Sequence, residues 1–111
     1  MSLFGDYIKE RQGKEILETG DGFATYYFPN PDTCYIEDIY VRPEARRTGL
    51  ASKMADQIVQ IAKENRCQAL IGSVSVAAFG STESLKALLA YGFELEGLKG
   101  ELIYLKKDIG S

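Results

Sequence analysis

YIEDIYVRPEARRTGLASKM (residues 35–54) joins a β-branched and aromatic run to a helical pattern through a short basic turn. Side chains in a strand alternate between two faces. One face of the run TCYIEDIYV (33–41) would carry Tyr35, Glu37, Ile39 and Val41. The other face would carry Cys34, Ile36, Asp38 and Tyr40. Because both faces are largely apolar, we predict a central strand that is covered on both sides.

The residues after the turn change to a helical period between Gly49 and Asn65. Apolar side chains recur there at steps of three and four, which predicts an amphipathic helix with one core-facing stripe. The stripe consists of Leu50, Ala51, Met54, Ala55, Ile58, Ile61 and Ala62. QALIGSVSV (68–76) predicts the next strand. A unit of this length predicts a right-handed crossover between two parallel strands.

The remaining elements lie on either side of this unit. FGDYIKERQG (4–13) predicts at best one short helix, and KEILETGDGFATYYF (14–28) predicts two strands around a glycine-rich turn. STESLKALLAYG (81–92) predicts a helix capped by Gly80 or Ser81 and ended by Gly92. Its inner face would hold Leu85, Leu88 and Leu89. FELEG and ELIYLKK predict two final strands. The fold class is therefore α/β or α+β, with a mixed sheet packed against helices.

Length and composition limit the class of protein. A chain of 111 residues predicts one domain over residues 1–111. The net charge of −3 disfavours nucleic-acid binding, and we expect no membrane partner because no apolar run is long enough to span one. We also expect no signal peptide. Two isolated cysteines, Cys34 and Cys67, without any histidine, predict no metal site and a reducing, cytoplasmic location.

The basic turn has two interpretations from its residues alone. A helix that begins directly after a central strand presents unpaired N–H groups and a positive dipole end, which suit a phosphate. Gly49 would let the backbone approach such a ligand, and Arg46 and Arg47 would add charge-assisted contacts. The other interpretation is a solvated loop. The turn is not a nucleotide P-loop, because no Lys-Ser or Lys-Thr follows the glycine.

Two motifs in this region resemble the GNAT superfamily of acetyl-CoA-dependent N-acetyltransferases. YIEDIYVRPEARRTGLASKM is similar to its motif A, whose [Q/R]-x-x-G-x-[G/A] positions fall on Arg46, Gly49 and Ala51. STESLKALLAYGFE (81–94) resembles motif B. The resemblance covers residues 34 to about 97, and the strand YIEDIYV is especially similar to that of spermidine/spermine-type acetyltransferases.

The resemblance implies a site for acetyl-CoA as co-substrate. Backbone groups of the strand would pair with the pantetheine arm, the Ile39 N–H would polarise the thioester carbonyl, and the amides after it would cradle the pyrophosphate. The coenzyme-binding residues implied are Ile39, Tyr40, Val41, Arg46, Arg47, Thr48, Gly49, Leu50, Ala51, Ser52, Ser81 and Ser84. Glu37 stands where these relatives have a general base, which an ammonium substrate requires. Alternatively, Glu37 is a partly exposed residue that pairs with a neighbouring cation.

The chain departs from the family pattern at two places. Leu88 occupies the position of the tyrosine that usually protonates the departing thiolate, and we expect the nearby Tyr91 to pack at the helix end. Only about a dozen residues precede Lys14, so the resemblance implies a short form that lacks most of the usual N-terminal region. The acceptor site would then be open, or completed by a second subunit in a homodimer.

The function implied is transfer of an acetyl group to a primary amine by direct attack in a ternary complex. The acceptor would be a small amine, a polyamine or a protein amine. Loss of the tyrosine motivates an alternative, a non-catalytic acyl-CoA-binding module of the same fold. A small phosphate- or nucleotide-binding protein is a third reading of the turn alone.

Overall fold

The computed structural model describes residues 3–46, 48–77 and 81–110, and it excludes the side chains of residues 4, 5, 8, 12 and 81–84. The chain begins with a helix and a hairpin, α1 (Leu3–Gln12), β1 (Glu15–Glu18) and β2 (Gly22–Asn30). The central unit follows as β3 (Thr33–Val41), the 3-10 turn η1 (Pro43–Ala45), α2 (Leu50–Glu64) and β4 (Ala69–Ser75). The chain continues as α3 (Ser81–Tyr91), β5 (Glu94–Lys99) and β6 (Leu102–Asp108). The predicted order of elements is confirmed.

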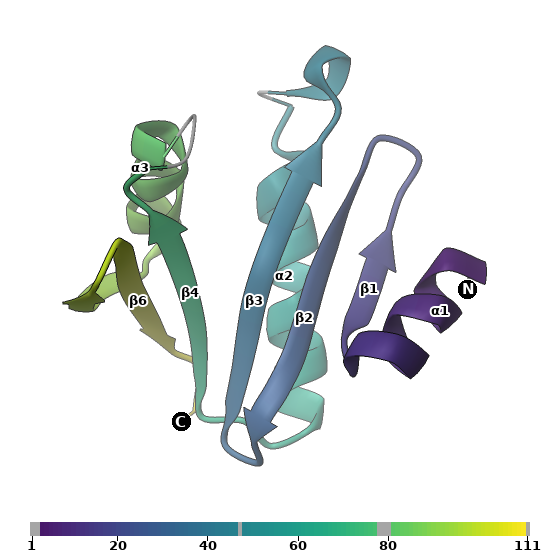
Figure 1. Cartoon of the computed structure of the whole chain (residues 1–111), viewed down its shortest axis with the longest axis horizontal. Coiled ribbons are helices and arrows are strands. Elements are labelled where there is room, and N and C mark those ends of the chain that lie inside the picture. The colour runs from purple at the N-terminus through teal and green to yellow at the C-terminus, as the bar shows by residue number, and fades with distance from the viewer. Residues whose placement is uncertain (1–2, 47, 78–80, 111) are drawn as a thin grey trace.

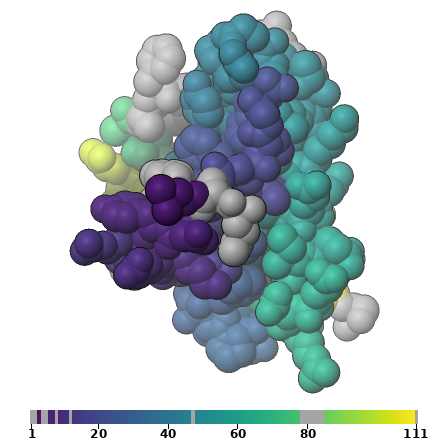
Figure 2. Space-filling view, turned by 90° about the vertical axis from the view of Figure 1, so that its right-hand side faces the viewer, coloured from purple at the N-terminus to yellow at the C-terminus, as the bar shows by residue number. Residues whose placement is uncertain are grey.

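The strands form one mixed sheet in the order β1-β2-β3-β4-β6-β5. Its single parallel pair among the described residues is β3 with β4, joined through α2, as the crossover predicts. The other neighbours pair antiparallel. Figure 1 shows α2 behind the sheet, and in the side view of Figure 2 it lies on the opposite face from α1. We name the face covered by α2 the helix face, and the one that bears α1 the front face.

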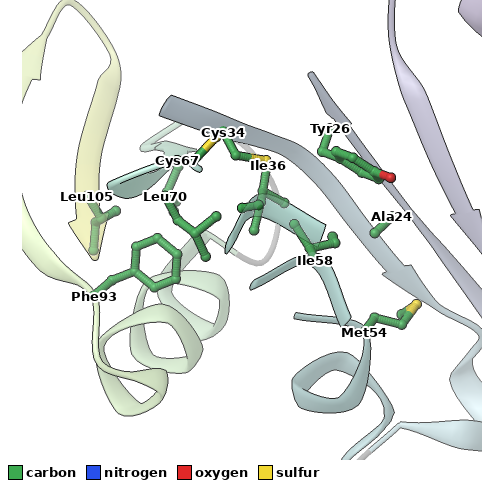
Figure 3. Packing of buried hydrophobic residues seen from close by; sticks show 12 residues of the cluster. Ala24, Tyr26, Cys34, Ile36, Met54, Ile58, Cys67, Leu70, Phe93 and Leu105 are labelled. Atoms are coloured by element: carbon green, nitrogen blue, oxygen red, sulfur yellow. The ribbon is translucent and has the colours of Figure 1, made fainter. Parts of the chain in front are cut away.

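The core lies between the sheet and the two longer helices. Met54 and Ile58 of α2 are fully buried in one cluster with Leu70 of β4 and Leu105 of β6. Figure 3 shows Phe93, which follows α3, beside Leu70 and Leu105 at one edge of this cluster. Leu85 and Leu88 pack against the same cluster, so α3 shares the helix face with α2.

Both cysteines belong to this apolar region, as predicted. Cys34 and Cys67 are buried free thiols. Burial raises the pKa of Cys34 to about 12, since the thiolate would lose hydration. A thiol that stays protonated at neutral pH is a poor nucleophile, which leaves both residues a packing role.

A β-bulge in β3 overturns the predicted division of its faces. Tyr26 pairs with Ile36 but Thr25 pairs with Asp38, so Glu37 is an extra residue opposite β2. A bulge shifts the alternation by one residue. Ile39 and Val41 therefore pack against the core on the same face as Cys34 and Ile36, whereas Tyr40 is 44% exposed on the front face. The prediction of a strand covered on both sides is also wrong here.

The helix predictions hold with two exceptions, and the predicted cap of α3 at Gly80 or the Ser81 side chain lies outside the described residues. Leu89 was expected on the inner face of α3 but is 43% exposed, and Ala51 is exposed although it was expected in the stripe of α2. Both lie at the margin of the apolar stripe, where the packing partner decides which side chains are covered. Gly13 and Gly92 end α1 and α3 with positive φ, as C-terminal glycines do.

Replacing Leu70 with alanine is expected to lower the free energy of unfolding by about 2–5 kcal/mol, since the side chain is fully buried and its loss leaves a cavity. Leu95→Ala is the control, because Leu95 is 64% exposed on β5 and should change stability by no more than about 0.5 kcal/mol. Urea unfolding of both variants measures the difference. Equal losses would contradict the assignment of Leu70 to the core.

Candidate functional site: an open strand edge beside a helix N-terminus

The parallel pairing of β3 with β4 stops half-way along the strands. It runs from Thr33 opposite Ala69 to Ile36 opposite Gly72. Beyond that point β3 remains paired with β2 up to Val41, while β4 continues beside β6. Figure 1 shows the two strands separating towards the end at which α2 begins. We name residues 37–41 of β3 the open edge, because their side towards β4 forms no strand pair.

The bulge decides which backbone groups face the open edge. Successive residues of a strand direct their N–H and C=O groups to opposite neighbours. The Asp32 carbonyl accepts a bond from Gln68 on the β4 side, whereas the Arg42 N–H donates to Asp21 on the β2 side. With the shift at Glu37 in between, the polar groups of Ile39 and Val41 point to the open edge. The Tyr40 carbonyl lies against Gly22 of β2, so the polar backbone groups of Tyr40 face β2 and not the open edge.

The N-terminus of α2 lies at the same end of the sheet. Gly49 is its N-cap in the left-handed conformation, with φ of 84°, and no side chain in the described ranges caps the helix. A side chain at this φ is strained, although a Cβ atom added here would meet no atom within 4 Å. The first-turn amides of Leu50, Ala51 and Ser52 lack intrahelical partners by the geometry of a helix start. They form an uncapped, positively polarised group of donors.

The basic residues of the turn are mostly engaged within it. Arg42 is paired with Glu44 at 2.8 Å and with Asp21 at 3.5 Å. The Nε of Arg46 donates to the Val41 carbonyl at 3.0 Å, and its guanidinium lies over the Tyr40 ring. The Thr48 hydroxyl donates to the Ala45 carbonyl. These contacts shape the turn, and the uncapped amides are left as the donors for an anion. Arg47 lies outside the described residues.

Glu37 is held by a lysine that the sequence did not single out. The Nζ of Lys14, just before β1, donates to Glu37 Oε1 at 2.6 Å across the front face. The hydrogen bond from Lys14 to Glu37 raises the pKa of Lys14, and the charges of Glu37 and Asp38 raise it further against the effect of partial burial. The side chains of Lys14 and Glu37 are 23% and 36% exposed. The pairing of Glu37 with a neighbouring cation is therefore present in this structure.

Aromatic and hydroxyl groups line the front face where β3 and β4 separate. The Tyr35 hydroxyl forms a hydrogen bond with the Ser73 hydroxyl of β4, in which either group can be the donor. Tyr35 lies one residue before Ile36, the last residue of β3 that pairs with β4. The Tyr35 ring stacks on Tyr27 with 5.2 Å between centroids. Burial raises the pKa of Tyr35, so its phenol stays protonated at neutral pH. This contact between the strands was not predicted, because only the sheet order brings Tyr35 and Ser73 together.

Among the described side chains of the second motif (85–94), no proton donor reaches the open edge. Leu88 faces Gly72 and packs into the core. Tyr91 donates its hydroxyl to Asp56 of α2 at 2.5 Å, and burial together with this contact raises the pKa of Tyr91. Tyr91 also packs beside Phe93, as expected. Ser81 and Ser84 lie in the first turn of α3, but their side chains are outside the described part of the structure.

Tyr91→Phe is expected to lower the free energy of unfolding by about 1 kcal/mol, because it removes one hydrogen bond to a carboxylate between α2 and α3. The same variant should retain the wild-type rate of thiol release from acetyl-CoA, since the hydroxyl is committed to Asp56. Thermal unfolding and a thiol assay on one preparation measure both effects. A large loss of rate without loss of stability would identify Tyr91 as an acid instead.

A shallow hollow of about 280 Å³ lies on the other side of β3. It is lined by the β1–β2 turn (18–22) together with Phe23, Tyr40 and Arg42. It faces β2 and not the open edge, and it offers no helix N-terminus. We therefore do not assign it to the site.

A mixed sheet with a half-separated parallel pair, and an uncapped helix start at the same end, is an arrangement that suits an extended ligand with an anionic group. The family model of the acetyltransferase (GNAT) family matches residues 21–93. The chain belongs to this family. A thialysine N-epsilon-acetyltransferase from Bos taurus is 36% identical over 53 residues, a match covering 44% of this chain and 31% of that protein.

Solved structures share the fold. A GNAT-family protein from Desulfovibrio desulfuricans superposes with a TM-score of 0.80 at 16% identity, covering 95% of this chain and 76% of that one. The PaiA N-acetyltransferase from Thermoplasma acidophilum, in complex with coenzyme A, superposes with a TM-score of 0.77 at 14% identity. The match covers 96% of this chain and 69% of that one. An acetyltransferase from Elizabethkingia anophelis with acetyl-CoA bound superposes with a TM-score of 0.74 at 16% identity. The match covers 93% of this chain and 82% of that one. At these identities the likeness establishes the fold.

Two other predictions concern the membrane and metals. Within the described ranges, no helix has the length and hydrophobicity needed to cross a bilayer. Within the same ranges, no group of three acidic or thiol side chains is arranged to hold a metal ion. The cytoplasmic location and the homodimer stay predictions.

Proposed function

We propose that this protein is an acetyl-CoA-dependent N-acetyltransferase that transfers the acetyl group to a primary amine. The observation that carries the proposal is the open edge of β3 beside the uncapped start of α2, with the Glu37 carboxylate on the same strand. Membership of the acetyltransferase (GNAT) family supports acetyl-CoA as the ligand. The structures of relatives with coenzyme A and acetyl-CoA bound agree with this choice.

The coenzyme would lie along the open edge with its pyrophosphate at α2. The amides of Leu50, Ala51 and Ser52 would bind the pyrophosphate, an arrangement that helix starts favour for anions. The pantetheine arm would pair with the polar groups of Ile39 and Val41 that point to the open edge. The Ile39 N–H would then polarise the thioester carbonyl. Arg46 would have to share or release the Val41 carbonyl that it now contacts.

The acceptor amine would approach from the front face. Glu37 is an acidic side chain on the open edge that already binds an ammonium group, that of Lys14. The name of the Bos taurus relative specifies the ε-nitrogen of thialysine, which supports a side-chain amine as acceptor. In the described part of the chain, α1 is the only helix on this face, so the approach is open or completed by a second copy of the chain.

Transfer would proceed by direct attack in a ternary complex. Glu37 would take a proton from the ammonium, the amine nitrogen would attack the thioester carbonyl, and the C–S bond would break. Coenzyme A would leave as a thiolate, which a thiol pKa of about 8.5 permits without a strong side-chain acid. Tyr35 is a protonated phenol at the separation of the strands and could donate the proton that Leu88 cannot.

A second candidate function is a non-catalytic acyl-CoA-binding module. Leu88 in the core and the commitment of Tyr91 to Asp56 favour it, because neither supplies a proton donor. A thiol-release assay with acetyl-CoA and a panel of primary amines, including polyamines and a lysine peptide, separates the two functions. Amine-dependent release supports the enzyme. Saturable coenzyme binding without release for any amine supports the module.

A further inference from the structure

We infer that Lys14 occupies the acceptor position and is itself acetylated from acetyl-CoA bound to the same molecule. The inference rests on the proposed function. It assigns a modification site, and it identifies the accepted group as the unbranched primary amine of a lysine side chain.

The position of Lys14 carries the inference. Its Nζ lies 2.6 Å from Glu37 Oε1, so the ammonium is already in contact with the carboxylate proposed to deprotonate the acceptor. Glu37 and Ile39 are two residues apart on β3, which places them roughly 6–7 Å apart along the strand. A thioester carbonyl bound at the Ile39 N–H would therefore lie near Glu37, the carboxylate that Lys14 contacts.

The other lysines with ion pairs lie elsewhere. Lys9 of α1 pairs with Glu15 of β1 at 3.3 Å, and its side chain is 69% exposed. Lys106 pairs with Asp108 on β6 and is 41% exposed. Lys14 is less exposed than either, at 23%, and would react more slowly with free acetyl-CoA in solution. Selective acetylation of Lys14, the least exposed of these three lysines, would therefore require acetyl-CoA bound at the open edge.

The reaction balances without any further reagent. Glu37 accepts one proton from the Lys14 ammonium, and the neutral Nζ attacks the carbonyl carbon of the acetyl thioester. A C–N bond forms and the C–S bond breaks. The departing thiolate takes the second N–H proton of the attacking nitrogen, so coenzyme A leaves as a thiol. The product amide is uncharged, so acetylation ends the ion pair, and Glu37 is available to an external amine once it has released its proton to solvent.

The groups around Lys14 also set the pH dependence. Glu37 stabilises the ammonium and raises its pKa above the ordinary 10.5, and Asp38 and Tyr27 act in the same direction. The neutral amine is therefore scarce at neutral pH, and the rate of self-acetylation should rise with pH as long as the protein stays folded. This contact makes Lys14 a slow internal competitor and not a rapid substrate.

Mass spectrometry of the purified full chain incubated with deuterated acetyl-CoA tests the inference. We expect label on Lys14 well above Lys9 and Lys106, at a rate per molecule that does not depend on protein concentration. Excess coenzyme A should suppress labelling of Lys14 and leave Lys9 unaffected. Glu37→Gln should reduce labelling of Lys14 by roughly 10²-fold, as expected for loss of a general base. Asp38→Asn is the control for loss of a neighbouring charge.

The outcomes separate this inference from the proposed function. If external amines are acetylated while Lys14 is labelled no more than Lys9, the inference is wrong and the enzyme assignment stands. If Lys14 is labelled but coenzyme A and Glu37→Gln have no effect, the labelling is chemical and the inference is equally wrong. If acetyl-CoA binds and neither Lys14 nor any amine is acetylated, both fail together.

Discussion

Glu37→Gln is expected to lower kcat/KM for an amine acceptor by roughly 10²-fold or more, because the amide cannot accept the proton that the ammonium must lose. The affinity for acetyl-CoA should stay at the wild-type value, since the coenzyme would contact the backbone of Ile39 and Val41. Glutamine preserves the size of the side chain and can still accept the bond from Lys14, so the fold should persist. A thiol-release assay gives kcat/KM, and calorimetry gives the affinity.

Asp38→Asn is the matched control for this variant. Asp38 is the next residue on β3, and it is exposed. Its replacement by asparagine removes the same charge from the same region of the front face. A loss that both variants share would reflect the electrostatic attraction of a cationic acceptor. A loss confined to Glu37→Gln identifies proton transfer. The role of Glu37 would be refuted by a kcat/KM that matches wild type across the pH range.

Gly49→Val is expected to weaken acetyl-CoA binding by about tenfold or more, which corresponds to 1.4 kcal/mol or more. Gly49 has φ of 84°, a conformation that a β-branched residue adopts only with strain. Relief of that strain would displace the first-turn amides of α2. The added side chain would also fill the open space from which a pyrophosphate would approach. Calorimetric titration of the folded variant measures the loss of affinity.

Gly13→Val separates loss of the site from loss of stability. Gly13 has φ of 68°, and a Cβ atom added there would likewise meet no atom within 4 Å. It ends α1, away from the start of α2, so it should show a comparable loss of stability with unchanged coenzyme affinity. Equal affinities in the two variants would contradict the assignment of the pyrophosphate to α2.

Local patterns were sufficient to predict the elements that position the site. The change from a two-residue to a three-to-four-residue apolar period around Gly49 marked the end of β3 and the start of α2, because both periods depend only on neighbouring residues. The parallel pairing of β3 with β4 followed from the length of the crossover. The packing of Leu88 against the core and the capping role of Gly92 also agreed with the sequence.

Features that depend on partner strands could not be predicted in this way. The bulge at Glu37 arises from the register of β3 against β2, and it alone turns the Ile39 side chain to the core and its backbone to the open edge. The contact between Lys14 and Glu37 joins residues 23 positions apart, and the bond from Tyr91 to Asp56 joins two helices. A carboxylate in an apolar strand was the one available signal that Glu37 needed a partner.

An NMR titration of the isotope-labelled protein with acetyl-CoA tests the central proposal most directly. We expect saturable shifts of the backbone amides of Ile39, Val41 and Leu50–Ser52, with little change at the β1–β2 turn that lines the hollow on the other side of β3. Binding that perturbs only the turn, or no binding at millimolar acetyl-CoA, would contradict the assignment of the open edge as the coenzyme site.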